Sequence, residues 1–355
     1  MLRYLDADGI HYPVFKKTLL FLAFFSVLFF LIVSFGFAQP ASSSLKGKII
    51  CIDPGHGGTA LTDHYRVGLA GEREEWVNLR VGLLLQKMLE DKGATVIMTR
   101  TRDTVVTLPV RAKLAVESKA DIFVSIHHNA TADTSVNFPI IYFHGNASEN
   151  LAGVAFGRLL ASNLIKTLYK NKVSPKGNFI SLVSDFTVFA DAGASVLRNT
   201  YGIPAVLAEA SFFTNANEEQ KLKREDHNRD EAIAYTAALE AFFNKPVPKI
   251  EAKNSKVPVI PPFKVFQEAE RMTPIAKRWH EDYSEAEQLL GKKDTASLRK
   301  AYDLFTRSAR SFPDSYVAAT CHKRRSELLR SMAKLEESAQ EAQRVREYYL
   351  SLHGK

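Results

Sequence analysis

Four short segments of the chain carry residue types that can bind a metal ion or transfer a proton. The first is IDPGHGG at 52–58, where a β-prone run ends in a turn and presents His56 among glycines that leave room around its imidazole. A histidine in this position can bind a metal ion if other ligands converge on it. The chain has only two cysteines, Cys51 and Cys321, so a metal site must use histidines and carboxylates.

The other three segments offer those partners. They contain Glu72, Glu74 and Glu75 at the start of a predicted helix, His127 and His128 at the end of one apolar strand, and Glu209 at the end of another. Each segment also has a structural reading, because acids favour a helix start and polar residues are common where strands end. A glutamate that ends a buried strand is costly to bury unless it is paired or functional.

Taken together, the segments indicate a site. Three strand ends and one helix start are polar at what would be the same edge of one sheet, and open α/β sheets bind ligands outside the carboxyl ends of their strands. Two histidines and one glutamate match the ligand set of a catalytic zinc ion that keeps its fourth position open.

The elements that must position these residues alternate along the chain from about 46 to 244. Apolar β-rich runs are predicted as strands at 48–52, 94–99, 121–126, 140–143 and 205–209. Amphipathic stretches are predicted as helices at 74–92, 110–118, 150–169 and 231–244. This alternation predicts an α/β fold with a twisted, mostly parallel or mixed sheet and helices on both faces.

Residues 1–38 are typical of an export signal. The 20 residues 18–37 are almost wholly apolar, follow Lys16 and Lys17, and precede small residues around Ala38. The run exceeds the apolar core of a cleaved signal peptide and is long enough to span a bilayer, so cleavage after Ala38 and retention as an inner-membrane signal anchor are both open. In either case the lysines place the rest of the chain outside the cytoplasm, in the periplasm or cell envelope.

Four further segments complete the predicted organisation. These are a short linker at 39–45, a catalytic domain at 46–245, a proline-rich extended linker at 246–265 and an all-α module at 266–355. The module is expected to be helical from 267 to 352, with three or four antiparallel helices, and part of it loosely resembles a tetratricopeptide hairpin. Residues 247–355 carry 21 Lys and Arg against 15 Asp and Glu, which we interpret as a solvated helical surface.

Seven motifs in order make residues 46–243 resemble the zinc-dependent N-acetylmuramoyl-L-alanine amidases that act in bacterial cell separation. The motifs are IDPGHGG at 52–58, E-x-x-x-N-L at 74–79, TR-x-x-D at 99–103, L-x-x-R at 108–111, ADIFVSIHHNA at 120–130, VLRNT at 196–200 and PAVLAEASFFTN at 204–215. The segment 176–195 is longer than in the compact form of the family and could line or cover the groove.

The resemblance implies roles for individual residues. One Zn²⁺ would be bound by His56, Glu74 and His127, with Glu72 and Glu75 as alternatives to Glu74. Neighbouring residues on a strand point to opposite faces, so His128 should not join His127. Glu209 matches the catalytic glutamate of the family, and the expected substrate-binding residues are Asn129, Arg198 and Asn215.

The function that the resemblance implies is hydrolysis of the amide bond between N-acetylmuramic acid and L-alanine in peptidoglycan. A different zinc hydrolase, such as a peptidase or deacetylase, and a wall-binding scaffold acting through the C-terminal helices remain open. Those helices could also dock a protein regulator, in which case deletion of 267–355 would spare activity on soluble substrate. A membrane contact is expected only at 18–37, and no nucleic-acid partner is expected.

Overall fold

The computed structural model describes residues 43–63, 65–170, 180–190 and 192–351. The predicted export signal, with its apolar run at 18–37, therefore lies outside the described residues. Among the residues that are described, no helix combines the length and the apolar composition needed to cross a bilayer. From Ser44 onward the chain forms one compact unit.

A seven-stranded mixed sheet runs through this unit in the order β2-β1-β3-β6-β4-β5-β7. Strands β1, β2, β3 and β6 are mutually parallel, β4 runs antiparallel to β6 but parallel to β5, and β7 runs antiparallel to β5. The strands are β1 (Ile49–Pro54), β2 (Thr95–Met98), β3 (Ile122–Asn129), β4 (Ile140–Phe143), β5 (Ser181–Ser184), β6 (Ala205–Phe212) and β7 (Tyr349–Leu350). All five predicted strands are present.

The helices fall into two groups along the chain. Those within the α/β part are α2 (Glu74–Glu90), α3 (Leu108–Glu117), α4 (Leu151–Thr167), the 3₁₀ turn η1 (Asp185–Thr187), α5 (Ser195–Asn199), α6 (Ala216–Leu222) and α7 (Glu225–Phe243). The C-terminal ones are α8 (Glu268–Arg271), α9 (Pro274–Lys277), α10 (Trp279–Leu290), α11 (Thr295–Ser311), α12 (Ala318–Ser331) and α13 (Leu335–Tyr348). The α/β fold with an additional helical region is thus as predicted.

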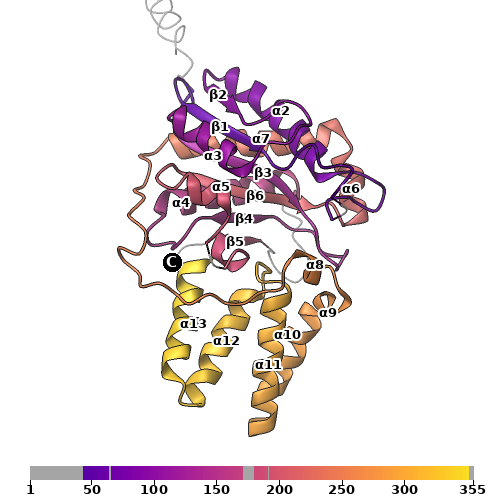
Figure 1. Ribbon diagram of the computed structural model, residues 1–355, viewed down its shortest axis with the longest axis vertical. Coiled ribbons are helices and arrows are strands. Elements are labelled where there is room, and N and C mark those ends of the chain that lie inside the picture. Colours follow the sequence, from indigo (N-terminus) through magenta and orange to yellow (C-terminus); the bar gives the residue numbers. More distant parts are fainter. Residues whose placement is uncertain (1–42, 64, 171–179, 191, 352–355) are drawn as a thin grey trace, which may run out of the picture. The chain divides into compact units, whose positions relative to one another are not determined.

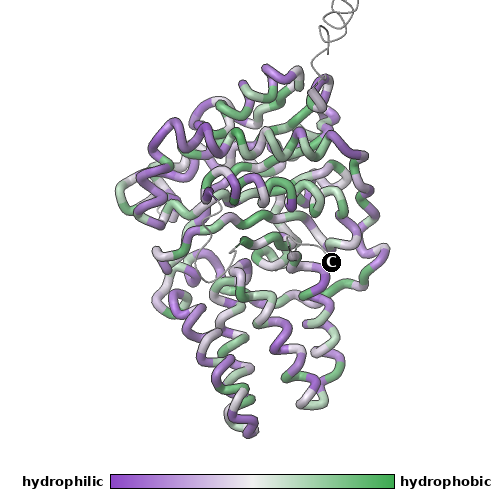
Figure 2. Tube along the Cα trace, turned by 180° about the vertical axis from the view of Figure 1, so that it is seen from behind, coloured by the Kyte–Doolittle hydropathy of each residue, from purple (hydrophilic) through white to green (hydrophobic). Residues whose placement is uncertain are grey.

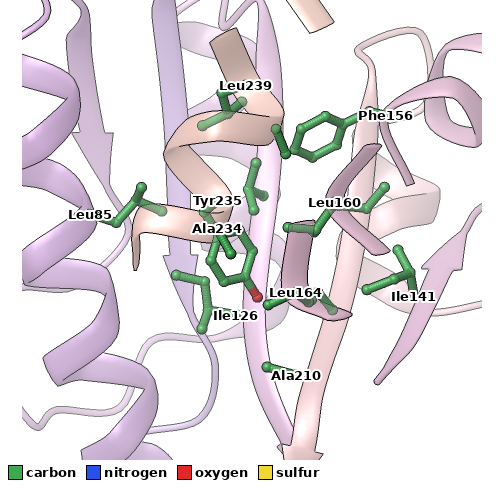
Figure 3. Packing of buried hydrophobic residues seen from close by; sticks show 14 of the residues in the cluster. Leu85, Ile126, Ile141, Phe156, Leu160, Leu164, Ala210, Ala234, Tyr235 and Leu239 are labelled. Carbon is green, nitrogen blue, oxygen red and sulfur yellow. The ribbon is translucent and has the colours of Figure 1, made fainter. Parts of the chain in front are cut away.

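One face of the sheet is covered by α2, α4 and α7. Side chains at alternate positions of β3, such as Ile126, point to this face and pack against Leu85 of α2, Leu160 of α4 and Tyr235 of α7. Figure 3 shows Tyr235 lying between the strands and α4, with its ring surrounded by aliphatic side chains. This continuous apolar layer fixes the start of α2, which carries the acidic cluster.

The opposite face packs against α3, α5 and the C-terminal helices. Phe138 and Phe212 of the sheet region lie 5.4 Å apart between ring centroids, and Phe138 lies 6.0 Å from Phe312 at the end of α11. Trp279 of α10 lies 5.0 Å from Phe312 and donates its indole N–H to Asp133 at 3.2 Å. The C-terminal helices therefore share a core with the sheet. Figure 1 shows them beside its β5 end, and Figure 2 shows hydrophobic and hydrophilic residues alternating along them.

The expectation that the chain is helical from 267 to 352, in three or four helices, is wrong at its end. After α13 the chain becomes extended, and Tyr349 and Leu350 pair with Val183 and Leu182 of β5. Pairing satisfies the backbone groups of the β5 edge that would otherwise stay open. Strand β5 itself was not predicted, because its four residues, Ser181–Ser184, are short and partly polar.

The predicted linker at 246–265 contains no helix or named strand, and it is anchored by hydrogen bonds and ring contacts. Glu149 accepts backbone N–H groups of Asn254, Lys256 and Val257 at 2.9 to 3.2 Å. Phe263 lies under the guanidinium groups of Arg325 and Arg344, at 5.0 and 5.7 Å from ring centroid to carbon. The linker thus follows a defined course between the α/β part and the helices.

Replacing Trp279, which is 3% exposed, by alanine should lower the free energy of unfolding by about 3–5 kcal/mol, because it empties a shared aromatic core. Ile275→Ala is the matched control, since Ile275 is 58% exposed in the neighbouring α9 and should change stability by less than about 1 kcal/mol. Urea denaturation followed by circular dichroism measures both. A separate unfolding transition for the C-terminal helices would contradict the shared core.

Candidate metal centre

Three potential metal ligands from distant parts of the chain meet at one edge of the sheet. His56 follows β1, Glu74 begins α2 and His127 lies in β3. His127 Nδ1 lies 2.9 Å, and His56 Nε2 3.2 Å, from the same oxygen of Glu74, Oε1. One ligand atom from each residue can be chosen so that all three lie within 4.8 Å of one another. The structure therefore brings together the three residues proposed from the sequence.

Two buried arginines hold the turn that carries His56. Arg100 donates to the carbonyl oxygens of Pro54 and Gly55, each at 2.8 Å. Arg111 donates to the carbonyl oxygens of Pro54 at 2.8 Å and His56 at 2.5 Å. These arginines belong to the TR-x-x-D and L-x-x-R motifs. Both motifs thus act on the backbone that positions His56.

Asp53 ties the same turn to the neighbouring strand ends. Its carboxylate accepts hydrogen bonds from Thr99 at 2.6 Å, Ser125 at 2.7 Å and Arg111 at 2.7 Å. Burial alone would raise the pKa of Asp53, but Arg111 and the two hydroxyl groups lower it below its ordinary value. An ionised, fully bonded carboxylate therefore locks the ends of β1, β2 and β3 together.

The backbone at the turn is adapted to this close approach. A Cβ at Gly55 would collide with the imidazole of His127, so only glycine lets the strand end lie against that ring. His56 itself has a φ of 56°, in the left-handed region that residues other than glycine seldom adopt. Such backbone persists where the surroundings determine it, as the two arginines do here.

Electrostatics favour the metal-binding protonation states. Burial would raise the pKa of Glu74, but the imidazoles of His56 and His127 lower it well below its ordinary value. Burial lowers the pKa of His127 despite its hydrogen bond to Glu74. An ionised carboxylate and a neutral imidazole are the forms that bind metal ions.

Glu209 lies beside this group on the neighbouring strand. It is the register partner of His127 in the parallel pairing of β3 with β6, so the two side chains share a face. Burial, together with the carboxylates of Glu74 and Asp314, raises the pKa of Glu209 well above its ordinary value. Burial and the neighbouring carboxylates therefore favour the protonated form of Glu209 more than in an exposed glutamate.

These residues line a cavity of about 300 Å³. Its walls also include residues for which the sequence predicts no role, among them Arg66, Tyr142, Phe266, Glu268, Arg271 and Met272. Arg66 donates from Nε to His56 Nε2 at 3.1 Å and also pairs with Glu268 of α8 at 3.2 Å. Arg66 lies in a loop and Arg271 in a helix, and neither belongs to a recognisable motif. Only the fold therefore identifies them as residues of the cavity wall.

His128 faces the other side of β3, as predicted. Its Nδ1 lies 2.8 Å from Asn78 Oδ1 and its Nε2 3.0 Å from Glu231 Oε2. Both partners are acceptors, because the amide nitrogen of Asn78 donates to Glu74 at 3.2 Å and Glu231 is a carboxylate. Burial would lower the pKa of His128, but Glu231 raises it above its ordinary value. A buried imidazolium–carboxylate pair therefore supports Asn78, which in turn orients the candidate ligand Glu74.

The two alternative glutamates point elsewhere. Glu72 pairs with Arg80 at 2.7 Å, and Glu75 pairs with Arg73 at 2.7 Å. Of the neighbouring acids, only Glu74 lies between the histidines.

The three expected substrate-binding residues do not lie together. Asn129 lines the cavity, although its side-chain oxygen accepts from the N–H of Ala130 at 2.8 Å. Arg198 donates to backbone carbonyls at 192 and 193, and Asn215 caps α6 by accepting from the N–H of Glu218 at 3.1 Å. Arg198 and Asn215 are not among the residues that line the cavity, and their bonds give them structural roles. A sequence motif does not distinguish an asparagine that caps a helix from an asparagine that binds a ligand.

The described part of segment 176–195 contributes to the cavity wall through Val188 and Phe189. Phe186 instead packs against His144, at 5.3 Å between ring centroids, and Asp185 pairs with the same histidine at 2.8 Å. The prediction that the segment lines the groove is supported at 188 and 189. Residues 176–179 and 191 lie outside the described residues.

Replacing Glu231 by alanine should cost about 3–5 kcal/mol of stability, because it leaves the buried His128 imidazolium without its partner. Glu240→Ala is the control on the same helix, since Glu240 forms a partly exposed pair with Lys92 and should cost less than about 1 kcal/mol. Thermal and urea denaturation compare the two variants. Equal losses would refute the charged pair.

The chain is similar to known proteins over its α/β part. A family model described as N-acetylmuramoyl-L-alanine amidase (Amidase_3) matches residues 50–241. The probable cell wall amidase LytH of Staphylococcus saprophyticus is 31% identical over 210 residues, covering 58% of this chain and 62% of that protein. LytH of Staphylococcus aureus is 30% identical over 200 residues, covering 56% and 60%. The match thus spans about three fifths of the length of these relatives.

The chain is also similar to two solved structures. The crystal structure of N-acetylmuramoyl-L-alanine amidase from Clostridium difficile 630 has 26% sequence identity and a TM-score of 0.48, covering 57% of this chain and 99% of that one. AmiC2 of Nostoc punctiforme has 24% identity and a TM-score of 0.47, covering 56% and 99%. The family model covers more than half of the 355 residues, and the chain belongs to the N-acetylmuramoyl-L-alanine amidase family.

Proposed function

We propose that this protein is a zinc-dependent N-acetylmuramoyl-L-alanine amidase that cleaves peptidoglycan during cell-wall remodelling or daughter-cell separation. The observation that carries the proposal is the meeting of His56, Glu74 and His127 with Glu209 in one cavity. Membership of the amidase family supplies the bond that such a site would cleave.

The donor set fits zinc. Two imidazole nitrogens and one carboxylate oxygen, from His56, His127 and Glu74, are a ligand set of catalytic zinc sites, in which the fourth position stays open for reaction. None of these three residues is a cysteine, and the two cysteines of the chain, Cys51 and Cys321, are buried and free. When bound, zinc supplies Lewis-acid chemistry, which makes water a better nucleophile and polarises a carbonyl group.

Glu209 performs the proton transfers. Its carboxylate takes a proton from the attacking water while the oxygen of that water bonds to the lactyl carbonyl carbon of N-acetylmuramic acid. The carbon–nitrogen bond then breaks, and Glu209 returns the proton to the leaving nitrogen of L-alanine. The immediate products are the lactyl carboxylic acid and a peptide with a free amino group. The acid then gives its proton to that amine, which leaves a carboxylate and an ammonium group, so atoms and charge balance.

The place of action that we propose is the periplasm or cell envelope. The apolar run at 18–37 with its preceding lysines supports export, with cleavage or retention as an inner-membrane anchor both compatible. Peptidoglycan lies outside the cytoplasm, so export and substrate agree. A protein regulator that binds the C-terminal helices stays a prediction.

Glu209→Gln should reduce product release by about 10²–10⁴-fold, because it removes the proton acceptor while keeping the shape of the side chain. Purified sacculi are digested, and the products are identified by chromatography and mass spectrometry. Glu240→Gln, on the surface of α7, is the control and should keep full activity. Shortened peptides or free glucosamine, in place of intact stem peptides, would instead identify a peptidase or a deacetylase.

Chelation should abolish activity, and added Zn²⁺ should restore it. The metal content of the purified protein, measured by mass spectrometry, should be about one zinc per chain and should fall strongly in His127→Ala, which removes one of three protein ligands. Undiminished activity in protein shown to be free of metal would refute zinc dependence.

A further inference from the structure

The wall of the catalytic cavity is built in part by a segment outside the matched family region. Residues 50–241 match the family, whereas Phe266, Glu268, Arg271 and Met272 belong to the start of the C-terminal helices. These residues line the same cavity as the metal ligands and Glu209. We propose that residues 266–272 form a subsite for the peptide stem of the substrate, and that Arg271 binds a carboxylate of that stem; this rests on the proposed function.

The segment is built into the structure. The N–H of Phe266 donates to the carbonyl oxygen of Arg310 at 2.9 Å, and the guanidinium of Arg310 lies 5.0 Å from the centre of the Phe266 ring. Glu268 reaches across the cavity to Arg66, at 3.2 Å. Contacts on both sides therefore fix this wall against the α/β part.

Arg271 is held in one orientation by a buried carboxylate. Its Nη2 donates to Asp314 Oδ1 at 3.0 Å, and Asp314 is fully buried. The other oxygen of Asp314 accepts the hydroxyl of Tyr142, a residue of β4 that also lines the cavity. Asp314 thus binds both Arg271 and Tyr142. Because burying an ion pair costs free energy, we do not attribute this pair to packing stability alone. It does, however, fix the direction of the guanidinium.

The remaining donors of Arg271 point to a ligand of a definite class. A guanidinium has five N–H donors in a planar fork, and one nitrogen is bound to Asp314. The side chain keeps 16% of its surface exposed and lines the cavity, so further donors are accessible there. A fork of this kind matches carboxylates in a bidentate manner. The sugar–lactyl part of the substrate offers neutral oxygens near the scissile bond, whereas the stem peptide offers carboxylates.

The neighbouring surface suits the rest of a peptide. Val188, Phe189 and Met272 supply apolar contact area, and Phe189 is 49% exposed. Small apolar side chains such as alanine gain from burial against such a surface. The cavity thus combines an apolar wall with the oriented guanidinium of Arg271, while the other arginine in its wall, Arg66, pairs with Glu268.

This arrangement changes the expectation for removal of the C-terminal helices. Deletion of 267–355 was expected to spare activity on soluble substrate if the helices only dock a regulator. In the structure the same deletion removes Arg271 and Met272 from the cavity wall and exposes the shared aromatic core. Loss of activity is therefore expected.

The subsite is tested by steady-state kinetics with the zinc-loaded full chain on two soluble muramoyl peptides. The second residue of the stem carries a free carboxylate in one and an amide in the other. Arg271→Gln should raise KM about tenfold or more for the free carboxylate and less than about threefold for the amide, with kcat little changed. Arg278→Gln is the control, because Arg278 is 54% exposed and pairs with Glu281 outside the cavity. Equal changes on both substrates, or none, would overturn the proposal.

Two further variants keep the result independent of folding. Arg271→Lys retains a charge beside Asp314 but loses the fork, and should show an intermediate, carboxylate-selective rise in KM. The double variant R271Q/D314N removes both members of the buried pair and should retain the full selective effect. Melting temperatures identify the folded variants. If the folded double variant binds both substrates as the wild type does, the subsite is refuted.

A binding measurement separates this proposal from the proposed function. The same two peptides are titrated into Glu209→Gln protein by calorimetry, with and without Arg271→Gln. Preference for the carboxylate peptide that is lost with Arg271 supports the subsite even if the wild type releases no stem peptide from sacculi. Absence of that preference in a wild type that does hydrolyse peptidoglycan overturns the subsite and leaves the amidase function standing.

Discussion

The parallel register of β3 with β6 is the constraint on which the rest of the site depends. It sets His127 directly beside Glu209, and the alternation of side chains along a strand then sends His128 to the opposite face. One histidine is thereby available to a metal ion and the next to the buried pair with Glu231. A shift of one residue would exchange these roles and bury the wrong imidazole.

The second requirement is that the end of β1 approaches β3 closely enough for His56 and His127 to share Glu74. Glycine at 55 removes the steric obstacle, and the two arginines that bind the carbonyls of the turn compensate for the unusual backbone of His56. Asp53 fixes the strand ends themselves. Conformational freedom is thus removed before any ligand binds, which is the condition for a metal site with defined geometry.

The C-terminal helices extend this logic beyond the family region. They share an aromatic core with the sheet, add a strand to its β5 edge and supply one wall of the cavity. Such an arrangement couples the stability of the helices to the shape of the cavity that holds the candidate metal ligands. A helical addition that forms part of a cavity can influence which ligands enter it, in contrast to a module tethered by a flexible linker.

Local sequence determined much of this protein. Strand-forming runs that end in histidine or glutamate, and an acidic helix start, predicted the α/β fold and a site at one edge of the sheet, because strand ends in a parallel sheet share an edge. The family resemblance favoured Glu74 among the three helix-start glutamates, and the structure places it between His56 and His127. Tertiary structure alone decided that Asn215 caps a helix and that Tyr349 joins β5. It also brought Arg66, Arg271 and Asp314 to the site. These outcomes depend on contacts between residues far apart in the chain, which neither periodicity nor a motif encodes.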